Sequence, residues 1–331
     1  MYDLIIKNGF LIDGTGNDGI YSDIAVKDGK IELIKDEVLS MAKEVIDAKG
    51  LVVTPGFIDS HSHADNAMLE FPDLKEKLEQ GITTSICGQC GATPAPVAND
   101  ITDENAREIE GFGKVSKIYK TFGSMVKIIK EVPLGSNVKC FVGHKALRTA
   151  VIGYKNKKPT RDEMGKMKAL LREAMENGAL GLSFGLIYTP GCYAETDELV
   201  ELAKVVKEYN GMLSAHIRDE GFNLLEAVEE FLTVIKAANV RAVFSHHKSM
   251  YKKNWGKVKL SLNMINDAIN EGYDIYCDVY LYTASHTGLI STIIPKAMRD
   301  MNNEGICEML KDSANRRKIK EHYIERYGDV C

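Results

Sequence analysis

The sequence predicts an α/β protein whose core is a (β/α) barrel of the TIM type, with about seven of the usual eight strands, preceded by a small β layer. Two observations support this fold class. From residue 55 onward, short apolar runs alternate with amphipathic stretches, which is typical of a parallel sheet with helices outside it. Before residue 55, short strand-like runs follow one another with only turn residues between them.

Residues 1–54 are interpreted as a separate N-terminal β layer, half of a composite β-sandwich. The runs DLIIKNGFLID, DIAVKDGKIELIK and KEVIDAKGLVVT have the composition of strands, and the turns DGTGND and KDGK interrupt them. We therefore place the first domain boundary between residues 54 and 55.

Residues 55–295 are predicted to form the barrel core. Seven segments have the character of its strands: GLVVTPGFIDSH, GITTSICGQC, NVKCFVGH, GALGLSFG, GMLSAHI, VRAVFSHH and YDIYCDVY. Because a closed barrel of this type needs eight strands, we expect one strand to be missing from this chain.

Helical patterns lie between several of these strands. The segment TRDEMGKMKALLREAMENG opens with Thr160 and Glu163 in the spacing of a capping box. Four of its apolar residues fall on one helical face: Met164, Met167, Leu171 and Met175. The segments DELVELAKVVKEYN and NLLEAVEEFLTVIKAAN have the same amphipathic helical pattern. Residues 296–331 form a polar segment that also has a helical pattern.

The composition is that of an ordinary globular protein. Of the 331 residues, 44% are hydrophobic and 27% charged, with a net charge of −5, so we expect no nucleic-acid partner. The N-terminus lacks the features of a signal peptide, and no apolar run approaches the ~20 residues of a membrane span. Seven scattered cysteines favour a reducing cytoplasm over a disulfide framework. We therefore expect a cytoplasmic protein without a membrane partner.

Metal-competent side chains gather at the carboxyl ends of the predicted strands, where the catalytic residues of such barrels lie. Cys90 ends the second strand. Six of the eight histidines lie at or just past strand ends: His61, His63, His144, His216, His246 and His247. Neutral imidazole and thiolate are good zinc ligands, and a metal with an open position activates water and polarises a carbonyl. The pattern indicates a hydrolytic metal centre.

Each of these features also has a structural explanation when it is taken alone. The pair His61 and His63 could be surface residues that share a strand face. The motif CGQC, which runs from Cys87 to Cys90, could be a redox pair or half of a zinc knuckle, although no second C-x-x-C follows it. A single buried cysteine is most often part of a core. Since His247 follows His246 directly, at most one of the two enters the barrel mouth. The combination favours the metal centre.

These motifs resemble a known family. The sequence PGFIDSHSH after a small β layer resembles the amidohydrolase superfamily. The sequences GITTSICGQCG, GLSFGLIYTPG, AHIRDE, SHHKSMYKKNWGK and DVYLYTA resemble its D-aminoacylase branch, the N-acyl-D-amino-acid deacylases. The resemblance covers essentially the whole chain. It implies a metal-dependent-hydrolase barrel that uses zinc-activated water to hydrolyse N-acyl-D-amino acids to a carboxylate and a D-amino acid.

The resemblance also implies how zinc would be held. A tightly bound zinc would be held by Cys90, His216 and His246, and a second, weaker position would use His61, His63 and Cys90. Many relatives bridge two metals with a carboxylated lysine at the end of strand four, but here that strand ends GLSFG. The thiolate would supply the bridge instead. The missing lysine argues against the alternative enzyme, a cyclic amidase of the dihydroorotase or hydantoinase type.

Several residues are similar in position to family residues that contact the substrate. Lys248 matches a lysine that meets the substrate carboxylate, and an ammonium beside a metal site is a reasonable anion anchor. A solvated lysine in a basic loop is the alternative for Lys248. Tyr188 and Arg218 are expected to line the pocket, with core packing and a structural ion pair as their alternatives.

The segment DVYLYTASH contributes further substrate contacts in the family. In this chain the resemblance assigns them to Tyr280, Tyr282 and Ser285. Leu281 replaces a usual proline, and His286 occupies a position where a small polar residue is common. The preference for a substrate side chain therefore stays open.

The family's proton-transferring aspartate lies at the end of the eighth strand. We expect that strand and its aspartate beyond Cys331, so no catalytic residue is assigned within the chain. Asp278, near the end of strand seven, is the internal alternative. Residues 296–331 resemble the start of a helical insertion that precedes the last strand.

Three hypotheses are therefore carried forward. The first is a zinc-dependent N-acyl-D-amino-acid deacylase, whose partner is a small molecule and whose activity as this chain alone is impaired by the missing aspartate. The second is a cyclic amidase. The third is a truncated, non-catalytic metal-binding chain, which a complementing C-terminal fragment or an oligomer would complete.

Overall fold

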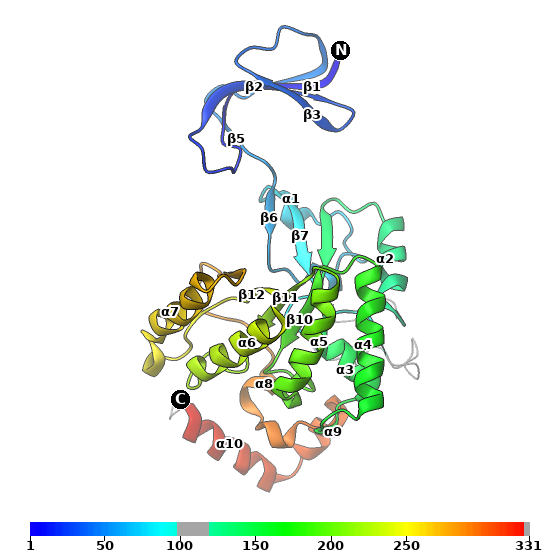
Figure 1. Cartoon of the computed structure of the whole chain (residues 1–331), viewed down its shortest axis with the longest axis vertical. Helices are drawn as coiled ribbons and strands as arrows, with labels where there is room; N and C mark the ends of the chain where they lie inside the picture. The colour runs from blue at the N-terminus through cyan, green and yellow to red at the C-terminus, as the bar shows by residue number, and fades with distance from the viewer. Residues whose placement is uncertain (98–118, 328–331) are drawn as a thin grey trace. The chain divides into compact units, whose positions relative to one another are not determined.

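The computed structural model describes residues 1–97 and 119–327. The chain divides into two compact units, Met1–Phe57 and Ile58–Cys331. Figure 1 shows strands alone in the first unit and alternating strands and helices in the second.

The first unit is a five-stranded sheet. Its strands are β1 (Tyr2–Leu11), β2 (Ile20–Lys27), β3 (Lys30–Lys35), β4 (Ala42–Asp47) and β5 (Val52–Val53). They have the order β3-β2-β1-β4, and β5 pairs with β1. The predicted KDGK turn joins β2 to β3 as an antiparallel hairpin, with positive φ at Asp28 and Gly29, as a type I′ turn requires. Ile5, Ala25 and Val38 form its small core.

The second unit contains the barrel strands. They are β6 (Phe57–Asp59), β7 (Ile82–Cys87), β8 (Asn137–Cys140), β9 (Val142–Gly143), β10 (Gly181–Gly185), β11 (Met212–His216), β12 (Arg241–Phe244) and β13 (Ile275–Cys277). They pair in the orders β6-β7-β8 and β9-β10-β11-β12-β13. Because only Phe141 separates β8 from β9, the two strands occupy one position, and the described residues contain seven barrel positions. The predicted incomplete (β/α) barrel is confirmed.

One predicted strand is in fact two. The sequence predicts a single strand over GLVVTPGFIDSH, but β5 pairs with β1 in the first unit and β6 pairs with β7 in the second. Pro55 lies between them. Proline lacks the amide hydrogen that a sheet ladder needs, and it restricts the residue before it. The apolar run therefore breaks at Pro55 and serves two sheets.

Helices cover the outside of the strands. The longer ones are α2 (Phe122–Glu131), α3 (His144–Ile152), α4 (Arg161–Glu176), α5 (Thr196–Glu208), α6 (Leu224–Ala238), α7 (Lys257–Asn270) and α10 (Ser313–Tyr327). The shorter ones are η1 (Ala64–Asn66), α1 (Lys75–Leu78), η3 (Gly191–Tyr193), η4 (Lys252–Asn254), α8 (Leu289–Ile293), η5 (Lys296–Met298) and α9 (Asn303–Met309). Helices α3 to α7 pack in sequence order, each against the next (Figure 1). Among the described helices, none combines the length and apolarity needed to cross a membrane.

Helix α4 begins where its sequence predicts. The Thr160 side chain accepts a hydrogen bond from the amide of Glu163, and the Glu163 carboxylate accepts one from the amide of Thr160. This reciprocal capping box satisfies two amide groups that the first turn leaves without partners. Met167, Leu171 and Met175 are buried on the predicted face. Local sequence therefore positions this helix against the core.

A buried polar cluster joins α3 to α5. The Glu198 carboxylate accepts hydrogen bonds from the Arg148 guanidinium and from Nε2 of His144, at 2.8 Å for the histidine. All three side chains are buried. Burial alone raises the pKa of Glu198, but the hydrogen bond from His144 and the charge of Arg148 outweigh burial and leave its pKa below the ordinary value. The cluster therefore holds a compensated charge inside the protein.

We predict that Glu198→Gln destabilises the protein by about 3–5 kcal/mol, because it leaves the Arg148 charge buried without its partner. The matched control is Glu201→Gln on the same helix. Glu201 pairs with Lys168 and Lys204 on the surface, and such pairs contribute at most about 1 kcal/mol. Urea unfolding followed by circular dichroism measures both variants. Equal effects at the two positions would contradict the assignment.

Candidate metal centre

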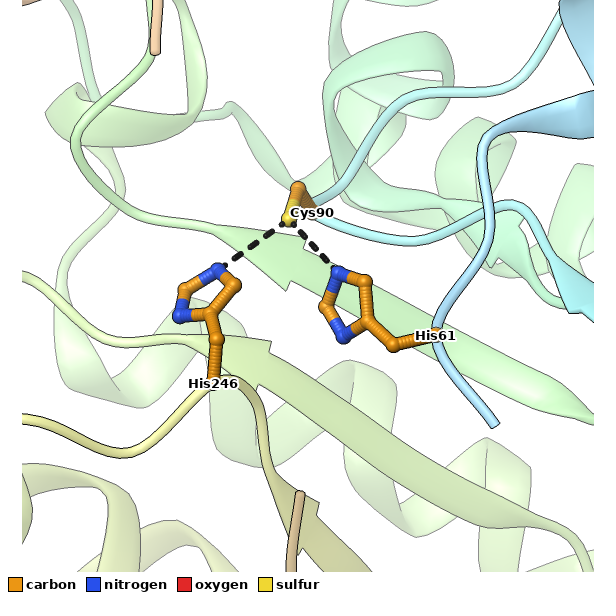
Figure 2. A group of neighbouring side chains, drawn as sticks. All are labelled: His61, Cys90 and His246. Carbon is orange, nitrogen blue, oxygen red and sulfur yellow. Dashed lines mark hydrogen bonds between the residues drawn. The ribbon is translucent and has the colours of Figure 1, made fainter. Parts of the chain in front are cut away.

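A thiol and two imidazoles meet at the carboxyl end of the strands. Cys90 follows β7, His61 follows β6 and His246 follows β12. The Sγ atom of Cys90 lies 3.4 Å from Nε2 of His61 and 3.5 Å from Nε2 of His246. Figure 2 shows the sulfur between the two rings, both of which turn a nitrogen toward it. The three atoms could bind one metal ion together.

A second group of possible ligands shares His246 with the first. Its other members are His216, the last residue of β11, and Glu220, four residues further on. The rings of His216 and His246 lie edge to face with centroids 4.4 Å apart. Both ring nitrogens of His216 are buried without a hydrogen-bond partner among the described residues. A buried polar atom without a partner is costly, so these nitrogens fit metal ligands.

Carboxylates orient the histidines from behind. Oε1 of Glu220 lies 2.8 Å from Nδ1 of His246, and Oδ2 of Asp278 lies 3.1 Å from Nδ1 of His61. Oδ1 of Asp278 also accepts a hydrogen bond from the backbone amide of His246. Histidine ligands are commonly held by a carboxylate on the nitrogen that faces away from the metal. In both pairs Nδ1 is held and Nε2 faces Cys90.

The loop that carries Cys90 has an unusual backbone. Cys90 itself has φ of 54°, in the left-handed region that side chains other than glycine rarely adopt. A Cβ atom on Gly88 would lie 2.2 Å from the backbone oxygen of Phe141, and one on Gly91 would lie 2.6 Å from the backbone nitrogen of Gly185. The CGQCG sequence therefore packs its backbone tightly against neighbouring strands, and glycine is required on both sides of the thiol.

Buried polar side chains hold this loop from inside the barrel. The Ser183 hydroxyl donates to the carbonyl of Gly88 and accepts from the amide of Gly91. The Gln89 side chain donates to the carbonyl of Ser60 at 3.0 Å and accepts from the Ser214 hydroxyl at 2.6 Å. The loop is thus attached to residues of three other strand positions, which fixes the place of the Cys90 sulfur.

The electrostatics of the group suit a bound cation. Burial raises the pKa of the Cys90 thiol well above its ordinary value, and the charges of Glu220 and Asp278 raise it further. Burial lowers the pKa of His216 to about 3, so its imidazole is neutral. A metal ligand must be a thiolate or a neutral imidazole. A divalent cation would stabilise the thiolate that the surroundings otherwise disfavour, and the nitrogen and sulfur donors match zinc.

Three other histidines of the sequence pattern have different positions. The ring of His63 lies 5.7 Å from that of His61, but its nitrogens belong to neither ligand group in the described part of the chain. His144 directly follows β9, as the sequence predicts. It is the first residue of α3, and its ring bonds to Glu198. His247 faces away from His246, as expected, and bonds to the Ser261 hydroxyl at 2.9 Å.

Two cavities adjoin the centre. One, of about 550 Å³, is lined by both polar and apolar groups, among them Cys90, His216 and His246. It is called the polar cavity here because charged side chains such as Glu220 and Lys248 line it. The other, of about 1070 Å³, has a mostly apolar wall from the segment that contains α8 and α9. Six residues line both cavities: His63, Cys90, Tyr188, His286, Thr287 and Ser291. Cys90 therefore lies at the boundary between the two cavities, whereas His216 and His246 line the polar cavity alone.

Most of the predicted substrate contacts reach the polar cavity. Its lining includes Lys248, Tyr280, Ser285, Tyr188 and Arg218. Tyr282 is 79% exposed and lines neither cavity.

Two of the predicted contacts already have partners. Nζ of Lys248 donates to Oε1 of Glu220 at 2.7 Å and lies 5.4 Å from the centre of the Tyr280 ring. The Arg218 guanidinium is bound to the Glu230 carboxylate at 2.8 and 2.9 Å. The structural ion pair considered for Arg218 is therefore present.

Sequence reasoning missed Glu220. This residue bonds both His246 and Lys248 and lies 3.6 Å from Nε2 of His216. Burial opposes its ionisation, but the neighbouring imidazoles of His216 and His246 and the ammonium of Lys248 lower its pKa to about 2. The signal for it was its place in AHIRDE, just past the end of a barrel strand.

Comparison with known proteins gives a consistent picture. The model of the amidohydrolase family matches residues 44–286. A D-aminoacylase from Alcaligenes xylosoxydans xylosoxydans is 35% identical over 295 residues, which cover 87% of this chain and 59% of that protein. The crystal structure of an N-acyl-D-glutamate deacylase from Bordetella bronchiseptica, complexed with zinc and a phosphonate mimic of the tetrahedral intermediate, is 35% identical with a TM-score of 0.80. That match covers 86% of this chain and 60% of the other.

A more distant structure shares the fold alone. An L-hydantoinase from Arthrobacter aurescens is 20% identical with a TM-score of 0.59, and the match covers 84% of this chain and 58% of the other. The chain thus spans about 60% of the length of the relatives that it matches. The family match covers most of the barrel, including Cys90, His216 and His246. The chain belongs to the amidohydrolase family, and its sequence and fold are similar to those of D-aminoacylases.

Proposed function

We propose that this protein hydrolyses the amide bond of N-acyl-D-amino acids, releasing a carboxylate and a D-amino acid. The observation that carries the proposal is the meeting of the Cys90 sulfur with His61 and His246, beside the unpartnered nitrogens of His216. This donor set suits zinc. The relatives named for deacylation of D-amino acids support the substrate class.

The candidate ligands would form two zinc positions. Cys90, His216 and His246 would hold one tightly bound ion, and His61 and His63 would join Cys90 at a second, weaker position. Zinc held there would polarise an amide carbonyl and activate water. Glu220 and Asp278 fix the rings of His246 and His61, so Asp278 suits the support of ligands better than proton transfer.

The two cavities suit the two ends of such a substrate. The polar cavity has the cations and hydroxyl groups that an amino acid carboxylate needs, with Lys248 as the proposed partner of the α-carboxylate and Tyr280 and Ser285 beside it. The apolar cavity would then take the acyl group. The protein's surroundings are proposed to be the cytoplasm, where a thiolate ligand stays reduced.

The absence of a lysine from β10 (Gly181–Gly185) supports this reading over a cyclic amidase. A lysine at the end of β10 is therefore not present to bridge two metals, and the thiolate of Cys90 would supply the bridge instead. The similarity to a hydantoinase is a similarity of fold alone. Because proteins with many different activities share one fold, it does not favour the cyclic amidase.

We predict that the zinc-loaded protein releases amine from N-acetyl-D-methionine or N-acetyl-D-glutamate, and that a chelator abolishes the release because hydrolysis requires the metal. Amine detection with and without added zinc measures this, and the L-enantiomers are the control. Turnover of dihydroorotate or hydantoin in place of the D-compounds would favour the cyclic amidase. Zinc binding with no turnover of any of these compounds would favour the non-catalytic hypothesis.

We also predict that Cys90→Ser weakens zinc binding by about 100-fold or more, since even residues that only orient ligands contribute about 10- to 100-fold. Metal analysis after equilibrium dialysis measures the affinity. The matched control is Cys192→Ser, because Cys192 is equally buried and lines the polar cavity but belongs to neither ligand group. Zinc affinity that falls equally in both variants, or in neither, would rule out Cys90 as a ligand.

A further inference from the structure

Arg299 is a buried cation without an ionic partner in the described part of the chain. Its side chain is 6% exposed and lines the polar cavity. Nη1 donates to the carbonyl oxygen of Ile187 at 3.0 Å, while Nε has no hydrogen-bond partner. Burying an unpaired charge is costly, and buried cations are normally paired. An anion that enters the cavity would supply the missing charge.

A second cation stands near Arg299. Lys296 lies one helical turn earlier in the chain and lines the same cavity, with its Nζ 5.7 Å from the centre of the Tyr193 ring. No carboxylate among the described residues pairs with it. Its pKa is lowered by burial and further by the positive charges of Arg218 and Arg299. Lys296 and Arg299 therefore share a region of positive potential.

The other cations of the cavity differ in this respect. Glu220 neutralises Lys248, and Glu230 neutralises Arg218. The cations of this cavity that have no carboxylate partner among the described residues are Lys296 and Arg299, which belong to η5 and the residue that follows it. A guanidinium with free donors matches a carboxylate, which it can bind through two hydrogen bonds.

This positive region is close to the candidate metal centre. Arg299 bonds the backbone of Ile187, the residue before Tyr188. The Tyr188 ring in turn lies 5.1 Å from that of His216. The cavity that Arg299 and Lys296 line also contains Cys90 and His246. An anion held there would stand near a substrate placed at the metal.

We propose that Arg299, assisted by Lys296, binds the side-chain carboxylate of the substrate, so that the preferred substrates are N-acyl derivatives of acidic D-amino acids. The proposal rests on the proposed deacylase function. The α-carboxylate is the other anion that such a substrate offers, and Lys248 is assigned to it. Arg299 is thus a specificity-determining residue.

The test compares N-acetyl-D-glutamate with N-acetyl-D-glutamine, which have almost the same shape but differ in side-chain charge. In the zinc-loaded protein we expect kcat/KM to favour glutamate by about 10- to 100-fold, the range of a charge-assisted hydrogen bond. Arg299→Gln should bring the ratio close to one and leave the turnover of the glutamine compound within about twofold. Lys296→Gln should reduce the ratio in part.

Arg316→Gln is the matched control. Arg316 lies in the same C-terminal helical segment and also donates to backbone carbonyls, but it lines neither cavity. In this variant the ratio of kcat/KM for N-acetyl-D-glutamate to that for N-acetyl-D-glutamine should equal the ratio in the unmodified protein. If Arg299→Gln does not fold, the result of Lys296→Gln decides. A ratio near one in the unmodified protein, or an equal loss on both substrates in the Arg299 variant, would overturn the proposal.

The same compounds separate this inference from the proposed function. If neither compound is hydrolysed, the deacylase function fails, and calorimetry then measures their affinities directly. Binding of N-acetyl-D-glutamate that is about tenfold tighter than that of the glutamine compound, and that is lost in Arg299→Gln, would still support the anion site. Equal affinities would overturn it.

Discussion

The candidate centre depends on one geometric constraint: the loop after β7 must place the sulfur of Cys90 at the carboxyl end of the barrel strands. The loop requires a left-handed backbone at Cys90 and close backbone approaches at Gly88 and Gly91. Such conformations cost energy and persist only where the surroundings impose them. Here Ser183 and Gln89 impose them through buried hydrogen bonds. The position of the thiol is therefore a property of the whole barrel interior and not of the loop alone.

Much of the fold could be predicted because its signals are local. The alternation of strand-like and helical segments predicted the barrel, and the capping box at Thr160 predicted the start of α4. The error at Pro55 shows the limit of such signals. An apolar run specifies that a segment is buried or paired, but not which sheet it joins. β5 pairs with β1 in the first unit and β6 pairs with β7 in the second, and both partners are distant in the sequence.

The candidate site was predictable in its residue types but not in its contacts. Strand ends indicated His61, Cys90 and His246 because parallel strands present their carboxyl ends on one edge of a barrel. The same reasoning placed His144 at a strand end, where it lies directly after β9. It did not predict that a helix begins at that residue and that the side chain bonds to Glu198. Pairings across 26 or more residues, such as Glu220 with His246, leave no local pattern.

Charge pairing also changes how the cations of the polar cavity are interpreted. Sequence position singled out Lys248, yet the structure gives it a carboxylate partner in Glu220. No sequence pattern indicated a role for Arg299, because an arginine in a polar helical segment is ordinarily solvated. Its burial without a counter-charge arises only when the chain folds back onto the carbonyl of Ile187, 112 residues away. The fold thus makes Arg299 a buried cation without a carboxylate partner in the described part of the chain, in the same cavity as the candidate metal ligands. The pairing of charges, more than the identity of a motif, indicates where an anionic group of a ligand would be held.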